Sequence, residues 1–187
     1  MAVEKFKFIK TSIEGLFIIE TKVFHDDRGF FVESYNLNEF VSNGLRETFV
    51  QDNHSHSKKG VLRGLHFQHK HPQGKLVRVI RGKVFDVAVD LRKDSPTFGK
   101  WFGIELSEEN RLQFYIPSGF AHGFLALEDV TDFLYKCTDF YYPDDELGII
   151  WDDPTINICW PIDNIESMVI SEKDRKLPTF EKVKKWL

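Results

Sequence analysis

Apolar and polar side chains alternate at intervals of two along much of this chain. Residues 84–91 show the pattern most clearly: the odd-numbered positions are apolar, whereas Asp86 and Asp90 fall on the opposite face. Residues 112–116 and 133–137 alternate in a similar way. Because successive side chains of a strand point to opposite faces, this period predicts half-buried β-strands.

Turn residues separate the predicted strands at short intervals. Further strands, each bounded by Gly, Pro, Asn or Asp, are expected over residues 17–24, 30–35, 61–68 and 76–80. The clearest hairpin joins 76–80 to 84–91 through Arg81-Gly82-Lys83, while Gly64 interrupts the strand over 61–68. Many short strands with turns between them predict an all-β sandwich, jelly roll or barrel.

Helical signals are few. Asn36 is a candidate helix cap, Glu39 follows three residues later, and Gly44 is placed to end the helix. Residues 166–175 and the tail after Thr179 form a region that we expect to be helical or irregular. At 187 residues with 42% hydrophobic side chains, we expect residues 1–187 to form a single packed domain.

Composition narrows the classes of function. The formal net charge of -4 argues against a nucleic-acid-binding protein, which normally carries a basic stripe. We expect no signal peptide and no membrane span, because the start lacks an apolar core segment and no apolar run reaches ~20 residues. Cys137 and Cys159 fit neither a zinc site nor a disulfide framework. We therefore predict a cytoplasmic protein.

Two spacings among the seven histidines resemble the motifs of the cupin superfamily. Pro117, Gly119 and His122 have the spacing of its second motif, and Gly60 and His66 have the separation that opens its first. However, Gln68 and Lys75 stand where metal-binding cupins have a histidine and a glutamate. Metal sites need imidazoles and carboxylates, and an ammonium group repels a divalent cation. We expect a cupin without a metal or other cofactor.

A more specific resemblance extends from about residue 17 to residue 175. Eight short segments resemble, in order, the signature of the dTDP-4-dehydrorhamnose 3,5-epimerase family. The segments are 24–33, 49–55, 60–68, 73–78, 116–124, 133–138, 151–154 and 171–175. This resemblance implies a cupin-type double-stranded β-helix, also called a jelly-roll barrel, with a short C-terminal helical region. It also implies an isomerase whose substrate is a dTDP-4-keto-6-deoxy sugar.

The resemblance assigns four residues to catalysis. His66 matches the family's base, Asp174 its partner, and Tyr135 its acid; Lys75 is placed to stabilise an enolate. Without the resemblance, His66 reads as a core histidine, Asp174 as a turn residue, Tyr135 as a barrel-lining aromatic and Lys75 as a surface lysine. The assignment of all four to one site therefore depends on the family.

The resemblance also implies a set of substrate-binding residues. Arg28, Arg63 and Lys173 match positions that contact the nucleotide or sugar, and Tyr141 matches a residue that stacks on thymine. The other matching positions are Phe24, Glu33, Gln51, Asn53, His122 and Glu146. The resemblance implies a homodimer with exchanged N-terminal strands, as is typical of the family, so Phe24, Arg28 and Glu33 are candidates to serve the partner's site.

Three alternatives remain open at this point. The first is a relative that epimerises only C3 or only C5, or a ketoisomerase, because one catalytic set can serve several carbons. The second is a non-catalytic cupin that binds a sugar, which a complete catalytic set disfavours. The third is a metal-dependent dioxygenase using the histidine cluster, which Lys75 and Gln68 disfavour.

Overall fold

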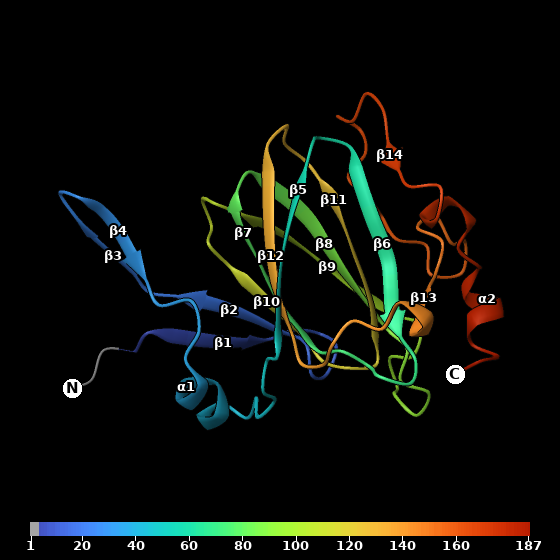
Figure 1. The fold of residues 1–187 in the computed structure, drawn as a ribbon, viewed down its shortest axis with the longest axis horizontal. Helices are drawn as coiled ribbons and strands as arrows, with labels where there is room; N and C mark the ends of the chain where they lie inside the picture. Colours follow the sequence, from blue (N-terminus) through green and yellow to red (C-terminus); the bar gives the residue numbers. More distant parts are fainter. Residues whose placement is uncertain (1–3) are drawn as a thin grey trace.

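The computed structural model describes residues 4–187, which form two facing six-stranded sheets and a small hairpin (Figure 1). The first sheet has the order β1 (Phe6–Lys10), β2 (Phe17–Thr21), β10 (Gln113–Ile116), β7 (Lys75–Arg81), β12 (Thr131–Cys137), β5 (Gln51–Ser57). The second has the order β13 (Glu146–Gly148), β6 (Val61–Gln68), β11 (Phe120–Ala126), β8 (Lys83–Asp90), β9 (Trp101–Ser107), and β14 (Val169–Ile170) also pairs with β6. The separate hairpin consists of β3 (Val23–Asp26) and β4 (Gly29–Val32).

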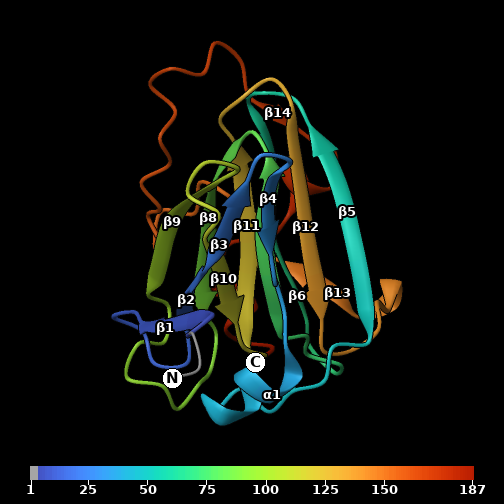
Figure 2. The ribbon, with the colours of Figure 1, turned by 90° about the vertical axis from the view of Figure 1, so that its left-hand side faces the viewer.

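The chain passes repeatedly from one sheet to the other. From β5 to β12 it alternates between the sheets except at the β8–β9 hairpin, and every pairing among these strands is antiparallel. Figure 2 shows the edge strands β9 and β5 at opposite margins of the resulting barrel. This winding is the jelly roll of the cupin type, which confirms the predicted fold class.

Apolar side chains are buried in three clusters that hold the barrel and its coverings together. One fills the space between the sheets and includes Val79, Phe114 and Phe133. A second joins the outer face of the second sheet to the C-terminal segment. The third packs α1 (Leu37–Ser42) through Phe40 against β1 and β2. The C-terminal segment therefore has a large apolar contact that fixes it beside β6 (Figure 1).

The strand β8 differs from the prediction of a half-buried strand. Val87 and Val89 face the C-terminal segment, as their apolar side chains suggest. Asp86 and Asp90, on the other face, are also completely buried, because that face points into the barrel and not to solvent. The period of two was correct, but the polar face is buried because each carboxylate finds hydrogen-bond donors inside the protein.

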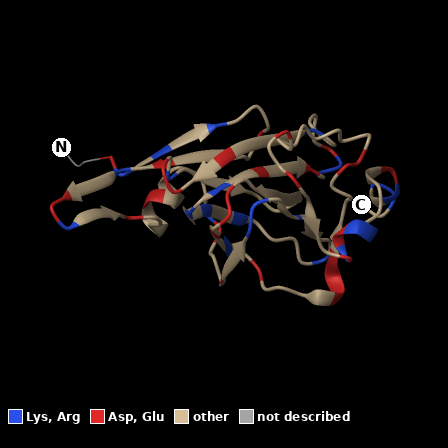
Figure 3. Ribbon diagram, turned by 90° about the horizontal axis from the view of Figure 1, so that it is seen from above, with Lys and Arg blue, Asp and Glu red and all other residues tan. Residues whose placement is uncertain are grey.

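The predicted strand over 17–24 divides in two. Residues 17–21 belong to the first sheet, whereas 23–26 leave it and pair with β4. The predicted strand over 30–35 is shorter, since β4 ends at Val32. The β3–β4 hairpin projects from the barrel, and its turn carries charges of both signs, from Asp26, Asp27 and Arg28 (Figures 1 and 3).

The predicted helix forms α1, and the Asn36 side chain accepts hydrogen bonds from the backbone N–H groups of Asn38 and Glu39. The C-terminal region is short and partly helical, as expected, with a 3₁₀ turn over Asp174–Lys176 and α2 over Phe180–Val183. A further 3₁₀ turn covers Pro143–Asp145. In the described part of the chain, no helix is long and apolar enough to cross a bilayer.

Asp90 holds the loop after β8 in place. Its carboxylate accepts hydrogen bonds from the Arg92 guanidinium at 2.8 and 2.9 Å and from the Ser95 and Thr97 hydroxyls at 2.6 Å. Burial alone raises the pKa of this carboxyl, but the donors outweigh it and lower the pKa to about 2. The ionised form therefore stabilises the fold above the unfolded pKa, and this contribution is lost as pH falls towards 2.

We predict that Asp90→Asn lowers the free energy of unfolding by about 2 kcal/mol at pH 7, because the lost charge is the one that the donors stabilise. The difference from the wild type should shrink as pH falls from 4 to 2. Denaturant titrations at several pH values measure both effects. Asp94→Asn, on the exposed part of the same loop, is the control. A constant difference across this pH range would contradict the assignment.

Candidate active site

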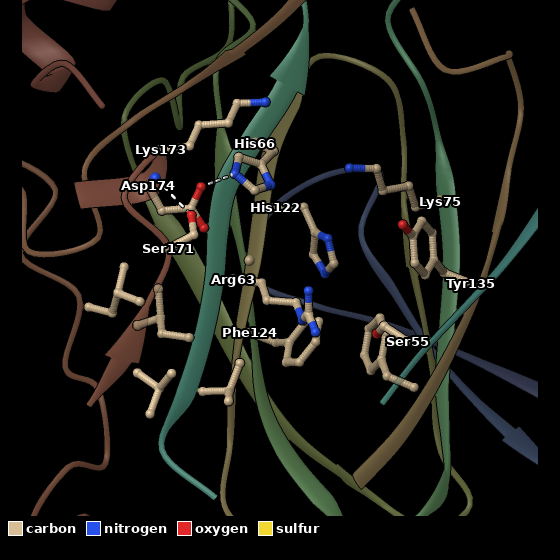
Figure 4. Close-up of a pocket in the computed structure, with 16 residues that line it drawn as sticks. Ser55, Arg63, His66, Lys75, His122, Phe124, Tyr135, Ser171, Lys173 and Asp174 are labelled. Atoms are coloured by element: carbon tan, nitrogen blue, oxygen red, sulfur yellow. Dashed lines mark hydrogen bonds and ion pairs between the residues drawn. The ribbon is translucent and has the colours of Figure 1, made fainter. Parts of the chain in front are cut away.

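A cavity of about 540 Å³ lies inside the barrel and is lined from both sheets and the C-terminal segment (Figure 4). His66 and Asp174 lie on one side of it, while Lys75 and Tyr135 lie on the other. The remaining lining residues are Ser55, Val61, Leu62, Arg63, His122, Gly123, Phe124, Phe133, Val169, Ile170, Ser171 and Lys173. All four residues expected to be catalytic therefore line one cavity.

His66 and Asp174 form a hydrogen-bonded pair, with 2.8 Å between His66 Nε2 and Asp174 Oδ1. The other carboxylate oxygen accepts the backbone N–H of Gly64 at 3.2 Å, and the Asp174 N–H donates to Ser171 Oγ at 3.0 Å. Burial disfavours the charge on Asp174, but these hydrogen bonds, chiefly that from His66, lower its pKa. Because the carboxylate accepts from Nε2, Nδ1 of neutral His66 carries the lone pair.

Gly64 makes this pairing possible through its lack of a side chain. Its φ of +114° is unfavourable for other residues, and a Cβ atom there would lie 2.6 Å from Gly123 Cα on the neighbouring strand. The close approach turns the Gly64 N–H towards Asp174. The glycine that interrupted the predicted strand is therefore part of the site.

Lys75 and Tyr135 come from adjacent strands of the first sheet, β7 and β12. Burial raises the pKa of the Tyr135 phenol, so the hydroxyl stays protonated at neutral pH. Burial lowers the pKa of Lys75, while the negative charges of Asp86 and Glu146 oppose this shift. Lys75 is thus a cavity residue and not the surface lysine that spacing alone suggested.

Arg63 lies towards the end of the cavity where Ser55 and Phe124 lie (Figure 4). Its Nε donates to Ser57 Oγ at 3.2 Å and its Nη2 to the carbonyl of His56, also at 3.2 Å. Ser55 Oγ is buried and has no hydrogen-bond partner among residues 4–187. Sequence reasoning missed Ser55 and Phe124, because a serine and a phenylalanine on alternating strands carry no chemical signature of their own.

A hydrogen-bonded group lies around Glu146, near His66. The Tyr141 hydroxyl donates to Glu146 Oε2 at 2.9 Å, and Lys173 forms an ion pair with the same carboxylate. The Tyr141 N–H donates to Gln51, which in turn donates to Asn53 at 3.0 Å. Burial works against ionisation of Glu146, but Lys173, His66 and Tyr141 lower its pKa. The structure thus links Tyr141, Glu146, Lys173, Gln51 and Asn53.

Of the ten predicted binding residues, Arg63, His122 and Lys173 line the cavity, and the hydrogen-bonded group around Glu146 contains four that do not. The other three lie on a different part of the fold. Phe24 and Arg28 belong to the projecting β3–β4 hairpin, where the Arg28 guanidinium pairs with Asp26. Glu33 forms an ion pair with Lys5 at 2.7 Å and accepts a hydrogen bond from Asn36. Within one protomer, therefore, these residues and the His66–Asp174 pair are on separate parts of the fold.

The cupin positions do not present a ligand set for a metal. The Gln68 amide donates to the backbone carbonyls of His71 and Phe140 and accepts the Tyr142 N–H. His54 and His56 both contact Asp132 at exposed positions outside the cavity. Among residues 4–187, no group of three or more His, Cys, Asp or Glu side chains has a geometry suited to a metal ion.

The remaining histidine of the cavity, His122, pairs with Asp86. Its Nε2 lies 3.0 Å from both carboxylate oxygens, and both side chains are buried. His122 was expected from the sequence, but Asp86 was taken for the outward face of its strand. The alternation along β8 shows that Asp86 lies on the face opposite Val87, but it does not show which of the two faces points into the barrel.

A cupin-type barrel that encloses a histidine–carboxylate pair facing a protonated tyrosine and a lysine defines an acid–base enzyme for a small ligand. Comparison with known proteins narrows this class. The family model for dTDP-4-dehydrorhamnose 3,5-epimerase matches residues 10–182. The chain belongs to the dTDP-4-dehydrorhamnose 3,5-epimerase family, and it is an isomerase of the epimerase type.

Individual relatives agree with this assignment. The chain is 60% identical to the dTDP-4-dehydrorhamnose 3,5-epimerase of Methanothermobacter thermautotrophicus, over 91% of this chain and 92% of the relative. It is similar to the crystal structure of a dTDP-6-deoxy-D-glucose-3,5-epimerase from Legionella pneumophila in complex with dTDP-4-keto-L-rhamnose, with a TM-score of 0.90 and 51% identity. That match covers 93% of this chain and 92% of the other.

A more distant structure is that of a 3'-monoepimerase from Streptomyces bikiniensis in complex with dTDP-quinovose. It matches with a TM-score of 0.87 and 32% identity, over 94% of this chain and 89% of the other. The fold is therefore shared by single and double epimerases, while the identity is greater with the double epimerases named above.

Proposed function

We propose that this protein inverts C3 and C5 of dTDP-4-dehydro-6-deoxy-D-glucose to give dTDP-4-dehydro-L-rhamnose, a step in dTDP-L-rhamnose biosynthesis. The observation that carries the proposal is the placement of the His66–Asp174 pair across one cavity from Tyr135 and Lys75 (Figure 4). Inversion of a carbon requires a base on one face and an acid on the other, and these groups have that arrangement.

His66 acts as the base in this mechanism. The C4 carbonyl acidifies the protons on C3 and C5, and Nδ1 of His66 takes each proton in turn. Asp174 accepts from Nε2, which keeps the lone pair on Nδ1 and stabilises the imidazolium that forms. When the C–H bond breaks, its electron pair moves into the ring and places negative charge on the C4 oxygen as an enolate.

Lys75 and Tyr135 complete the reaction from the opposite side. The Lys75 ammonium, buried at the cavity wall, stabilises the enolate oxygen more strongly than it would in water. Tyr135, protonated because burial raises its pKa, delivers a proton to the carbon on the face opposite His66. One proton leaves and another arrives, so the step needs no redox partner.

The nucleotide lies towards Tyr141 and Arg63 in this proposal. Tyr141 has 46% of its surface exposed, which leaves a ring face available for thymine, while the hydrogen bond to Glu146 holds its phenol. Arg63 is already oriented by Ser57 and binds the diphosphate. The other expected contacts are Gln51, Asn53, His122, Glu146 and Lys173.

The β3–β4 hairpin supports a homodimer with exchanged N-terminal strands. Phe30 and Phe31 on this hairpin are 57% and 67% exposed, an unfavourable display of apolar surface for a monomer. In such a dimer, Phe24, Arg28 and Glu33 contribute to the cavity of the partner subunit. Arg28 then adds a second guanidinium at the diphosphate, which one protomer does not supply from its own hairpin.

Epimerisation of C3 alone is the second candidate, because the 3'-monoepimerase from Streptomyces bikiniensis shares the fold. One base and one acid serve either carbon if the sugar ring shifts between two positions. Following C3 and C5 separately distinguishes the two functions.

We predict opposite isotope signatures for the base and the acid. His66→Ala should abolish both epimerisation and exchange of deuterium into C3 and C5, because no group remains to break the C–H bonds. Tyr135→Phe should still exchange deuterium, while inversion slows by ~10²–10⁴-fold, as expected for loss of a general acid. NMR in D₂O with dTDP-4-dehydro-6-deoxy-D-glucose measures each carbon.

Tyr142→Phe is the matched control, since Tyr142 stacks on His71 and does not line the cavity. If the Tyr135→Phe variant inverted C3 and C5 at the wild-type rate, Tyr135 would only pack in the cavity and would not be the acid. Normal exchange by His66→Ala would overturn the base assignment. Inversion at C3 alone by the wild type would replace the proposed function with that of a monoepimerase.

We predict that Tyr141→Ala weakens binding of dTDP by ~1–3 kcal/mol, the range for stacking of an aromatic side chain on a base. Calorimetry with dTDP measures this change, and turnover at saturating substrate should be largely retained. Phe140→Ala, at the exposed neighbouring position, should leave the affinity unchanged. If the wild type and Tyr141→Ala bound dTDP with equal affinity, Tyr141 would not be part of the nucleotide site.

Strand exchange predicts complementation between two inactive variants. Arg28→Ala and His66→Ala should each have low activity alone, whereas mixed dimers contain one site with both residues intact. Unfolding and refolding an equal mixture should therefore restore up to about a quarter of wild-type activity, since half of the dimers are mixed and each has one complete site. No recovery in dimers shown to be mixed would contradict the exchange.

A further inference from the structure

Asp86 is a buried carboxylate whose side chain interacts with a residue of the cavity. It lies on β8 with none of its surface exposed, and both of its oxygens lie 3.0 Å from Nε2 of His122. A buried carboxylate without a donor is strongly unfavourable, so this hydrogen bond is a requirement of the fold. The pair resembles His66–Asp174 in composition, but its two residues lie on adjacent strands of the second sheet.

The barrel places His122 directly beside the proposed base. His122 on β11 pairs with His66 on β6, and its ring stacks on Phe133 with 6.1 Å between centroids and an interplanar angle of 21°. With Nε2 engaged by Asp86, Nδ1 has no hydrogen-bond partner among residues 4–187 and is the nitrogen left for a ligand in the cavity. Strand pairing and aromatic stacking restrict rotation of the ring.

The carboxylate determines which nitrogen carries the proton. An ionised carboxylate only accepts hydrogen bonds, so Nε2 of His122 must be the donor. Burial lowers the pKa of His122 and the positive charge of Lys75 lowers it further, although Asp86 opposes them. The ring is therefore neutral at pH 7, and Nδ1 has a lone pair that accepts a hydrogen bond and cannot donate one.

We propose that Asp86 is a positioning residue that makes His122 a hydrogen-bond acceptor, so that His122 Nδ1 binds a hydroxyl group of the sugar and not its keto oxygen. The inference rests on the proposed function for the identity of the ligand. A keto oxygen or an enolate has no proton to donate, so it is unfavourable opposite a lone pair. The keto oxygen is thereby directed to Lys75, and the orientation of the sugar ring is set.

Nitrogen-15 NMR of the wild-type protein tests the tautomer directly. Long-range proton–nitrogen spectra distinguish the protonation states of a histidine ring, and His122→Gln identifies the His122 signal by its loss. We expect a neutral ring with the proton on Nε2 at pH 7. A proton on Nδ1, or a doubly protonated ring, would overturn the proposal whether or not the protein is an epimerase.

The same spectra identify the ligand atom. The His66→Ala variant, which is expected to hold its substrate unreacted, is mixed with dTDP-4-dehydro-6-deoxy-D-glucose, and dTDP alone is the comparison. We expect the Nδ1 signal to move towards the position of a hydrogen-bond acceptor with the sugar nucleotide only. A ring that becomes protonated on Nδ1 would show that His122 donates to the keto oxygen, and an equal response to dTDP would place the contact outside the sugar.

Asp86→Asn tests the positioning role, because an asparagine side chain offers Nε2 an NH2 donor as well as an oxygen acceptor and so no longer holds the proton on Nε2 as the carboxylate does. We expect the tautomer to change and the affinity for dTDP-quinovose, a sugar nucleotide without a keto group, to fall about tenfold, while that for dTDP stays within about twofold. Asp132→Asn, which removes a carboxylate from two exposed histidines, should change neither affinity. An unchanged affinity for dTDP-quinovose in the folded Asp86→Asn protein would refute the proposal. If that variant does not fold, the nitrogen-15 spectra of the wild-type protein still test which nitrogen of His122 carries the proton.

Discussion

The hydrogen bonds of Asp174 tie together the two parts of the molecule that the site requires. The residue belongs to the C-terminal segment, yet its carboxylate accepts from His66 and from the Gly64 backbone on β6. Apolar packing holds that segment against the second sheet, so the carboxylate is delivered to the barrel wall by a rigid contact. The tautomer of His66, and with it the position of the basic lone pair, depends on this arrangement.

Charge compensation is the second constraint on the barrel interior. The cavity region contains Asp86, Glu146 and Asp174, and each lies beside a cationic or titratable partner. A carboxylate buried without such a partner would become protonated and lose its role. The carboxylates of Asp86 and Glu146 likewise oppose the lowering of the Lys75 pKa that burial causes.

The two sheets contribute different chemistry to the cavity. His66, His122 and Arg63 come from the second sheet, whereas Lys75 and Tyr135 come from the first. A ligand between the sheets is thus contacted from two sides by groups that rigid strands position. This division explains why a jelly roll suits a reaction in which one proton leaves and another arrives on the opposite face.

The sequence by itself determined the strand pattern, the Asn36 cap, the family and seven of the residues that line the cavity. These are local properties, since alternation, capping and short motifs each depend on a few residues that are close together in the sequence. Tertiary structure alone decided that Asp86 and Asp90 point inward, that Ser55 and Phe124 line the cavity, and that Arg28 lies apart from His66 within one protomer. Alternation shows that a strand has two different faces, but only the pairing of distant strands settles which face encloses the cavity.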